Sequence, residues 1–110
     1  MIQSIRQGDL YYCHFGDPIK DRPVLILSRS EINAIRSNIV VALITRTVRN
    51  IPLEVPVGKA EGLPKDGVVS LGDIHTISKT RLSEKKGEIS AEQLERVGEG
   101  LKMLFALTSA

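Results

Sequence analysis

The sequence predicts a mainly β fold that ends in one helix. Short apolar or alternating runs are separated by turn signals such as "GDP" at 16–18 and "GLPKDG" at 62–67. Clear helical periodicity is found only after residue 90. Many short strands followed by one helix favour a small twisted barrel or half-open sheet with a packed helix. With 110 residues, the chain is expected to be a single domain, 1–110.

The first half of the chain supplies three expected strands. Residues 8–15 ("GDLYYCHF") are rich in aromatic and apolar side chains. Residues 24–28 and 39–45 contain continuous apolar runs, which are typical of strands buried on both faces. Pro23 cannot donate to a sheet ladder, so it is expected at the first residue of its strand or on an edge. The polar interlude "RSEINAIRSN" is expected to hold one helical turn capped by Ser30.

The second half is expected to complete the sheet. Residues 53–57 alternate in polarity but contain Pro56, which indicates an edge strand or the end of a strand. Residues 68–78 are expected to form a strand interrupted by a bulge or bend at Gly72. Residues 81–89 are the last short strand or hairpin.

The tail carries the signature of an amphipathic helix. Ser90 and Gln93 make a capping box, and apolar residues then recur at helical spacing on one face: Leu94, Val97, Leu101, Leu104 and Phe105. Gly98 and Gly100 lower the helix propensity, so packing on the sheet is expected to stabilise this helix.

Composition limits the function classes. Hydrophobic residues make up 42% of the chain and charged residues 25%, as in ordinary soluble domains. No run approaches the roughly 20 apolar residues of a membrane span, and no signal-peptide core is found, so no membrane role is expected. The single cysteine, Cys13, cannot form an intramolecular disulfide and is expected to be a small buried hydrophobe; this suits a reducing cytoplasm.

The charge is unevenly distributed. Residues 88–110 carry four glutamates against Arg96 and Lys102, which gives this segment a net charge of −2. Because the whole chain has a net charge of +2, the rest of the chain carries +4. A basic body with an acidic tail is compatible with a polyanionic ligand.

Metal and cofactor chemistry is not expected. His14, His75 and Cys13 are the only histidines and cysteine, and no pair of them has metal-ligand spacing. A Cys–His nucleophile assembled from these three is open, but nothing in the sequence favours it. No glycine-rich phosphate loop is present, because "GLPKDG" lacks the lysine–hydroxyl ending of a P-loop.

Two polar residues stand at the ends of the buried strands. Arg22 precedes "PVLIL", and Pro23 pushes it into an extended conformation; Thr45 ends "IVVALI". If the strands are neighbours, a guanidinium and a hydroxyl meet at the rim of a dry core. Such donors match a phosphate and can stabilise charge on phosphorus without a metal. An ordinary solvated arginine and an ordinary strand-end threonine fit the same positions, and spacing alone does not decide.

The segments "GDLYYCHF", "DRPVLILS", "NIVVALIT", "LEVPV", "GLPKDGVVSL", "TISKTRL" and "GEIS", followed by an acidic helix, resemble the MazF/PemK family of toxins from type II toxin–antitoxin modules. The resemblance spans Gly8 to about Leu107. It implies a homodimer of SH3-like barrels, a fold shared with the CcdB-like gyrase poisons. It also implies cleavage of single-stranded RNA by 2′-hydroxyl attack without metal or cofactor, which inhibits translation and growth.

The same resemblance assigns products, residues and a partner. The family leaves a 2′,3′-cyclic phosphate and a 5′-hydroxyl, and its catalytic arginine and threonine map onto Arg22 and Thr45. An acidic antitoxin is expected to fold onto the basic groove and compete with RNA. The candidate RNA contacts are Arg46, Arg49, Lys65, Asp73, His75 and Lys79.

Three departures from the family pattern affect what is expected. The loop between the first two strands is shortened to "GDPIKD". Asp73-Ile74-His75 stands where the family has Gln-Ile-Arg, so the RNA sequence preference is expected to differ. His14 replaces an aspartate, and either packing or a general-base role is open for it.

Two non-enzymatic readings stay open from sequence. One is a gyrase-poison-like toxin of the same fold, and the other is an RNA-binding barrel that has lost catalysis. Neither needs the pair Arg22 and Thr45, so this pair separates them from a ribonuclease.

Overall fold

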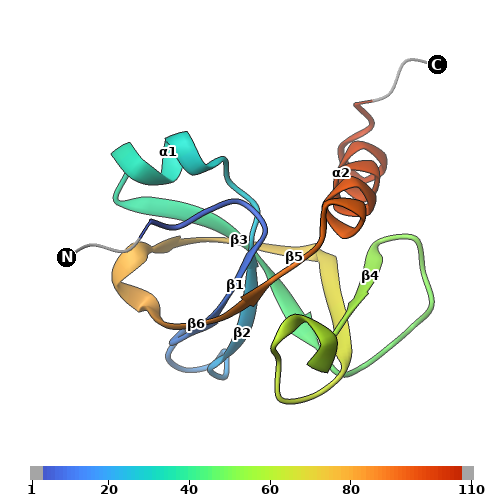
Figure 1. Ribbon diagram of the computed structural model, residues 1–110, viewed down its shortest axis with the longest axis horizontal. Helices are drawn as coiled ribbons and strands as arrows, with labels where there is room; N and C mark the ends of the chain where they lie inside the picture. The colour runs from blue at the N-terminus through green and yellow to red at the C-terminus, as the bar shows by residue number, and fades with distance from the viewer. Residues whose placement is uncertain (1–3, 108–110) are drawn as a thin grey trace.

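The computed structural model describes residues 4–107 and shows six strands and one long helix (Figure 1). The elements follow in this order: β1 (Asp9–Cys13), β2 (Arg22–Ile26), α1 (Ser30–Ile35), β3 (Asn38–Thr45), β4 (Glu54–Val57), the 3₁₀ helix η1 (Lys59–Glu61), β5 (Gly67–Ser78), the 3₁₀ helix η2 (Lys79–Arg81), β6 (Leu82–Glu88) and α2 (Ala91–Phe105). All strand pairs are antiparallel, in the order β4-β5-β3-β2-β1-β6. The predicted mainly β class with a C-terminal helix is confirmed.

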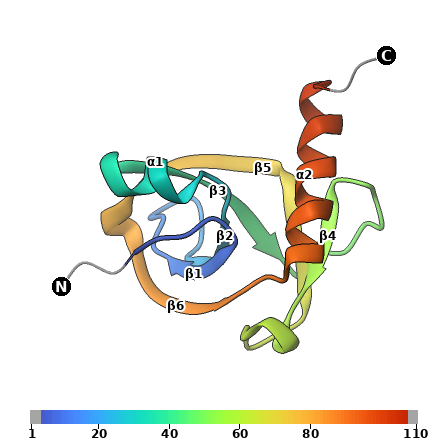
Figure 2. The same cartoon turned by 45° about the horizontal axis from the view of Figure 1, so that its top comes forward.

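The sheet is strongly curved but not closed (Figure 2). β5 pairs with β3 on both sides of a register shift, with Ala42 opposite Ile74 and Leu43 opposite Ser70. The residues between them, 71–73, form the bulge that was predicted around Gly72, and the strand bends there. β4 lies at one edge of the sheet, as predicted from Pro56, and β6 lies at the other.

Two glycines bring the ends of the sheet close together. A Cβ on Gly62 would lie 2.2 Å from the carbonyl oxygen of Lys86, and one on Gly87 would lie 1.8 Å from that of Glu61. Only glycine permits such an approach of two backbones. The segment after β4 therefore rests against β6, which gives the open sheet its barrel-like shape.

The sheet is buried on both faces, as the continuous apolar runs predicted. Alternate residues of a strand point to opposite faces. Val24 and Ile26 belong to one core with Cys13, whereas Leu25 belongs to a second core that also contains Val97 of α2. All five of these side chains are buried.

Two details of the first half differ from the prediction. β2 begins at Arg22, and Pro23 is its second residue; Pro23 lies opposite Tyr12 of β1, while the β3 ladder begins only at Val24. The prediction that Ser30 caps the short helix is wrong. Arg29 occupies the N-cap position, and the Ser30 hydroxyl instead accepts a hydrogen bond from the backbone N–H of Gln7, at 3.1 Å.

α2 begins as predicted but extends past the sheet. The capping box is confirmed, because Gln93 N donates to Ser90 Oγ at 3.1 Å and Ser90 N donates to Gln93 Oε1 at 2.7 Å. A Cβ on Gly100 would lie 2.4 Å from Leu71 Cδ1, so this glycine lets the helix approach β5.

The predicted apolar face of α2 is only partly buried. Leu94, Val97 and Leu101 pack on the sheet, as expected. Leu104 and Phe105 continue the same apolar face but are exposed. The last turns of α2 project past the sheet (Figure 2). Among the described residues, no helix combines the length and apolar character that a membrane crossing requires.

Candidate active site

Arg22 and Thr45 lie at facing ends of neighbouring strands. β2 and β3 pair with Val24 opposite Leu43. Continuing this register by two residues puts Arg22 opposite Thr45, and directly opposite residues share one face of a sheet. Both residues line the same pocket, which has a volume of about 360 Å³. The two residues therefore line one concave site at the ends of β2 and β3.

The pocket around this pair combines basic, acidic and apolar groups. Arg46, which follows Thr45, and Lys65, in the loop before β5, add two cations to that of Arg22. Asp21 and Asp66 add two carboxylates, and Asp66 Oδ1 accepts a hydrogen bond from Lys59 N at 2.9 Å. The remaining walls are Tyr12, Pro23, Ile44, Leu63, Pro64 and Gly67. Such a site suits an anion that has an apolar group beside it.

Backbone contacts fix the two central side chains. Arg22 is half-buried, and its Nε donates to the carbonyl oxygen of Lys20 at 3.2 Å. Thr45 Oγ1 accepts a hydrogen bond from Thr47 N at 3.2 Å, so its hydroxyl hydrogen can be donated to a ligand. A Cβ on Gly67 would lie 2.4 Å from the Thr45 carbonyl oxygen, so glycine is needed where β5 meets this end of β3.

The other predicted RNA contacts lie outside this pocket. Arg49 is exposed, and its backbone N–H is held by the buried carboxylate of Glu54, at 2.8 Å. His75 lies opposite Val41, four residues along β3 from Thr45, which corresponds to roughly 13 Å of strand.

Two further candidates for RNA contacts lie in β5 and directly after it. Asp73 accepts a hydrogen bond from Ser70 Oγ at 2.7 Å, and Lys79 lines a different pocket together with Arg6. Of the six predicted contacts, the structure gathers only Arg46 and Lys65 around the central pair.

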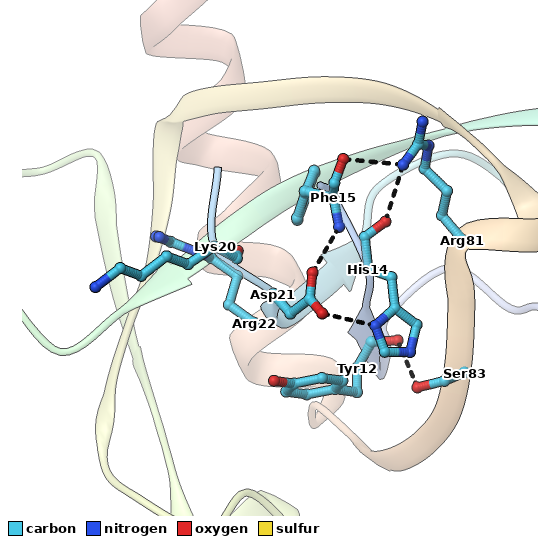
Figure 3. Close-up of polar contacts among 8 residues, drawn as sticks. All are labelled: Tyr12, His14, Phe15, Lys20, Asp21, Arg22, Arg81 and Ser83. Carbon is cyan, nitrogen blue, oxygen red and sulfur yellow. Dashed lines mark hydrogen bonds and ion pairs between the residues drawn. The ribbon is translucent and has the colours of Figure 1, made fainter. Parts of the chain in front are cut away.

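His14 lies beside the pocket and is bound to Asp21 (Figure 3). Its Nδ1 is 2.8 Å from Asp21 Oδ2, and Asp21 Oδ1 accepts a hydrogen bond from Phe15 N at 3.0 Å. The hydrogen bond from His14, and next that from Phe15, hold the pKa of the Asp21 carboxyl below its ordinary value. A general-base role for His14 stays a prediction.

Asp21, Tyr12 and Asp66 line the pocket but were missed from the sequence. Asp21 carried one signal, its place directly before Arg22 in "KDRP". Tyr12 carried another, because two adjacent tyrosines in a strand must face opposite sides. Tyr11 is buried, whereas the half-buried ring of Tyr12 lines the pocket and lies 5.8 Å from Lys86 Nζ.

Cys13 does not provide a nucleophile. The residue is fully buried, as predicted, and burial raises the pKa of its thiol to about 11. The thiol therefore stays protonated at neutral pH, which disfavours the Cys–His arrangement. Within residues 4–107, no three His, Cys, Asp or Glu side chains gather as a metal site would require.

Known proteins resemble this chain over nearly its whole length. The endoribonuclease MazF3 of Mycobacterium tuberculosis is 37% identical over 94 residues, which cover 86% of this chain and 91% of that protein. The solved structure of the Mycobacterium tuberculosis toxin MazF-mt6 has a TM-score of 0.84 at 34% identity, covering 92% of this chain and 99% of that one. A mycobacterial endoribonuclease solved in complex with its cognate antitoxin has a TM-score of 0.86 at 26% identity, covering 96% and 99%.

The family assignment rests on the match of nearly the entire sequence. Residues 6–105 match the family described as PemK-like, MazF-like toxin of type II toxin–antitoxin system. This span contains every strand, both helices and all residues that line the pocket. The chain therefore belongs to the PemK/MazF family of toxins from type II toxin–antitoxin systems.

Proposed function

We propose that this chain is the toxin of a type II toxin–antitoxin pair and acts as an endoribonuclease in the cytoplasm, where cleavage of RNA would inhibit translation and growth. The observation that carries the proposal is that Arg22 and Thr45 line one pocket together with the cations of Arg46 and Lys65. The relatives named endoribonuclease support the reaction class. A gyrase poison or a bare RNA-binding barrel has no need of this pair.

The chemistry follows from the donors in the pocket. The nucleophile is the ribose 2′-hydroxyl next to the scissile phosphate, so the protein must align this hydroxyl with the leaving 5′-oxygen. Negative charge then grows on the phosphoryl oxygens, where Arg22 offers full charge and two Nη groups and Thr45 offers an O–H donor. The 2′-hydroxyl loses its proton as its oxygen bonds to phosphorus, and the bond between phosphorus and the 5′-oxygen breaks. The leaving 5′-oxygen takes up a proton, which gives a 2′,3′-cyclic phosphate and a 5′-hydroxyl.

The products provide the first test. The purified chain is incubated with long single-stranded RNA in excess EDTA. We expect cleavage, with 3′ fragments that accept phosphate from a kinase directly and 5′ fragments that cannot be ligated until the cyclic phosphate is opened and removed. If cleavage stops in EDTA, the proposed mechanism is wrong. If the chain instead leaves RNA intact and inhibits DNA supercoiling, the gyrase-poison reading replaces it.

RNA is proposed to pass along the pocket by way of Arg46 and Lys65. Both side chains are exposed cations beside the Arg22–Thr45 pair, so they can contact flanking phosphates. Tyr12 offers a half-buried aromatic face in the same pocket, on which a base can stack. The bound RNA strand would have to continue beyond the pocket to contact the other candidates, Arg49, Asp73, His75 and Lys79.

We also propose that an acidic antitoxin segment covers the pocket. One mycobacterial relative has been solved with its cognate antitoxin. In this chain, Arg46 and Lys65 are the exposed cations that such a segment would share with RNA, so the two would compete.

A homodimer is the proposed assembly, and the exposed end of α2 supports it. Met103, Phe105 and Leu107 are 59%, 58% and 71% exposed, which is unusual for three neighbouring large apolar side chains. We expect light scattering at micromolar concentration to give the mass of two chains, and Phe105→Glu to shift it toward one. Ile35→Glu on α1, where the side chain is 85% exposed, is the control. A wild-type monomer would contradict the dimer.

A further inference from the structure

The loop between β1 and β2, residues 14–21, is closed at its base by one carboxylate (Figure 3). The two oxygens of Asp21 accept different hydrogen bonds: Oδ2 lies 2.8 Å from His14 Nδ1, and Oδ1 lies 3.0 Å from Phe15 N. The first residues of the loop are thereby joined to its last residue. We refer to Asp21, His14 and Phe15 as the clasp.

The clasp is attached to the rest of the fold through Arg81. The Arg81 guanidinium donates from Nη1 to the carbonyl oxygens of His14 and Phe15, at 3.2 and 2.9 Å. The backbone N–H of His14 donates in turn to the Arg81 carbonyl oxygen at 2.8 Å. His14 and Phe15 are therefore held from one side by η2 and from the other by Asp21, so Asp21 is anchored to a fixed point and not to a free loop.

Arg22 depends on the backbone that the clasp holds. It directly follows Asp21, and its Nε donates to the carbonyl oxygen of Lys20, on the other side of Asp21. The position of its guanidinium is thus set by residues 20–22. We propose that Asp21 is a positioning residue that, through the clasp, holds Arg22 in the pocket opposite Thr45.

Two alternatives for Asp21 are less consistent with the geometry. A general-base role is less consistent because each oxygen of Asp21 already accepts a hydrogen bond within the clasp, and these bonds favour the ionised form. Its lowered pKa also makes it a weak base. An ordinary surface ion pair contributes little to stability. Asp21 differs from such a pair because it also accepts a hydrogen bond from Phe15 N and directly precedes Arg22.

This inference rests on the proposed function, so its test examines both the ribonuclease activity and the positioning role of Asp21. We expect Asp21→Ala to lower kcat for RNA cleavage by about a hundredfold, the effect of misplacing a catalytic group by roughly 1 Å. KM should change less, because the exposed Arg46 and Lys65 remain. Asp21→Asn keeps an acceptor for Phe15 N and should recover most of the rate. Asp17→Ala, an exposed aspartate in the same loop, is the control and should match wild type.

His14 provides a second readout. If His14 acts only through the clasp, His14→Ala should lower kcat for RNA cleavage by no more than Asp21→Ala does. The double variant should then have the same kcat as Asp21→Ala alone. Additive losses would assign His14 a separate catalytic role and would overturn the clasp as its only function.

The Arg22 Nε–H resonance in an NMR spectrum reports the same positioning without RNA. We expect its chemical shift to change in Asp21→Ala and to keep the wild-type value in Asp17→Ala. If wild type cleaves RNA but Asp21→Ala cleaves equally well, the clasp proposal fails and the proposed function stands. If wild type does not cleave, the proposed function fails, and an unchanged resonance would refute the clasp as well. Equal loss of folded protein in Asp21→Ala and Asp21→Asn would overturn the positioning role in favour of a structural one.

Discussion

Replacing Arg22 with alanine should lower the rate of RNA cleavage by about a thousandfold or more. Loss of one donor to a developing oxyanion costs about a hundred- to a thousandfold in rate. The loss for Arg22 should lie at the upper end of that range because its guanidinium supplies a full charge and two Nη groups. The nearby cations of Arg46 and Lys65 are exposed to solvent and should not replace it. The single-turnover rate at saturating enzyme measures this loss directly, because binding no longer limits it.

Two variants of the same pocket show whether that loss is specific. Thr45→Ala should lower the single-turnover rate of cleavage by about a hundredfold, because a neutral donor contributes less than a charged one. Lys65→Ala should leave the single-turnover rate intact and instead weaken binding, reducing the slope of log affinity against log salt by about 0.7 for a single strand. Undiminished cleavage by Arg22→Ala would remove the central residue from the mechanism and favour the non-enzymatic readings.

The facing pair was predictable because two simple rules converge on it. Continuous apolar runs marked β2 and β3 as buried strands, and polar residues stood at the ends of both runs. Antiparallel neighbours bring the start of one strand to the end of the next, so Arg22 and Thr45 come to line the same pocket without any special loop. The continuous apolar composition of each run also predicted a core on both faces of the sheet.

Features that depend on distant contacts were not predictable. The Ser30 hydroxyl was available to cap α1, but Gln7, 23 residues earlier, donates to it instead. Periodicity identified the apolar face of α2, but not the point at which the sheet beneath it ends, so the exposure of Leu104 and Phe105 was not predictable. The hydrogen bond between His14 and Asp21 requires the loop of residues 14–21 to close, and no local propensity encodes that closure.

A deoxyribose at the cleaved nucleotide should abolish cleavage while leaving RNA binding largely intact. In the proposed mechanism the pocket supplies donors to the phosphate, and the attacking oxygen is the 2′-hydroxyl of the substrate itself. Removing the 2′-hydroxyl removes the nucleophile, and no rearrangement of Arg22 or Thr45 can replace it. Most of the binding energy comes from phosphate contacts and stacking, which a single missing hydroxyl does not change.

The measurement begins with mapping the cut on a long transcript, after which a short oligonucleotide that spans the mapped position is synthesised in three forms. The first is all-ribose, the second carries one 2′-deoxy nucleotide 5′ to the cut, and the third carries it one position further along. Only the second should resist cleavage, and all three should bind with similar affinity. The all-ribose form should be cut only as a single strand, because in-line attack requires the ribose to leave its helical stack. Cleavage of the second form would mean that water attacks the phosphate, and the roles assigned to Arg22 and Thr45 would then need a nucleophile that the pocket does not supply.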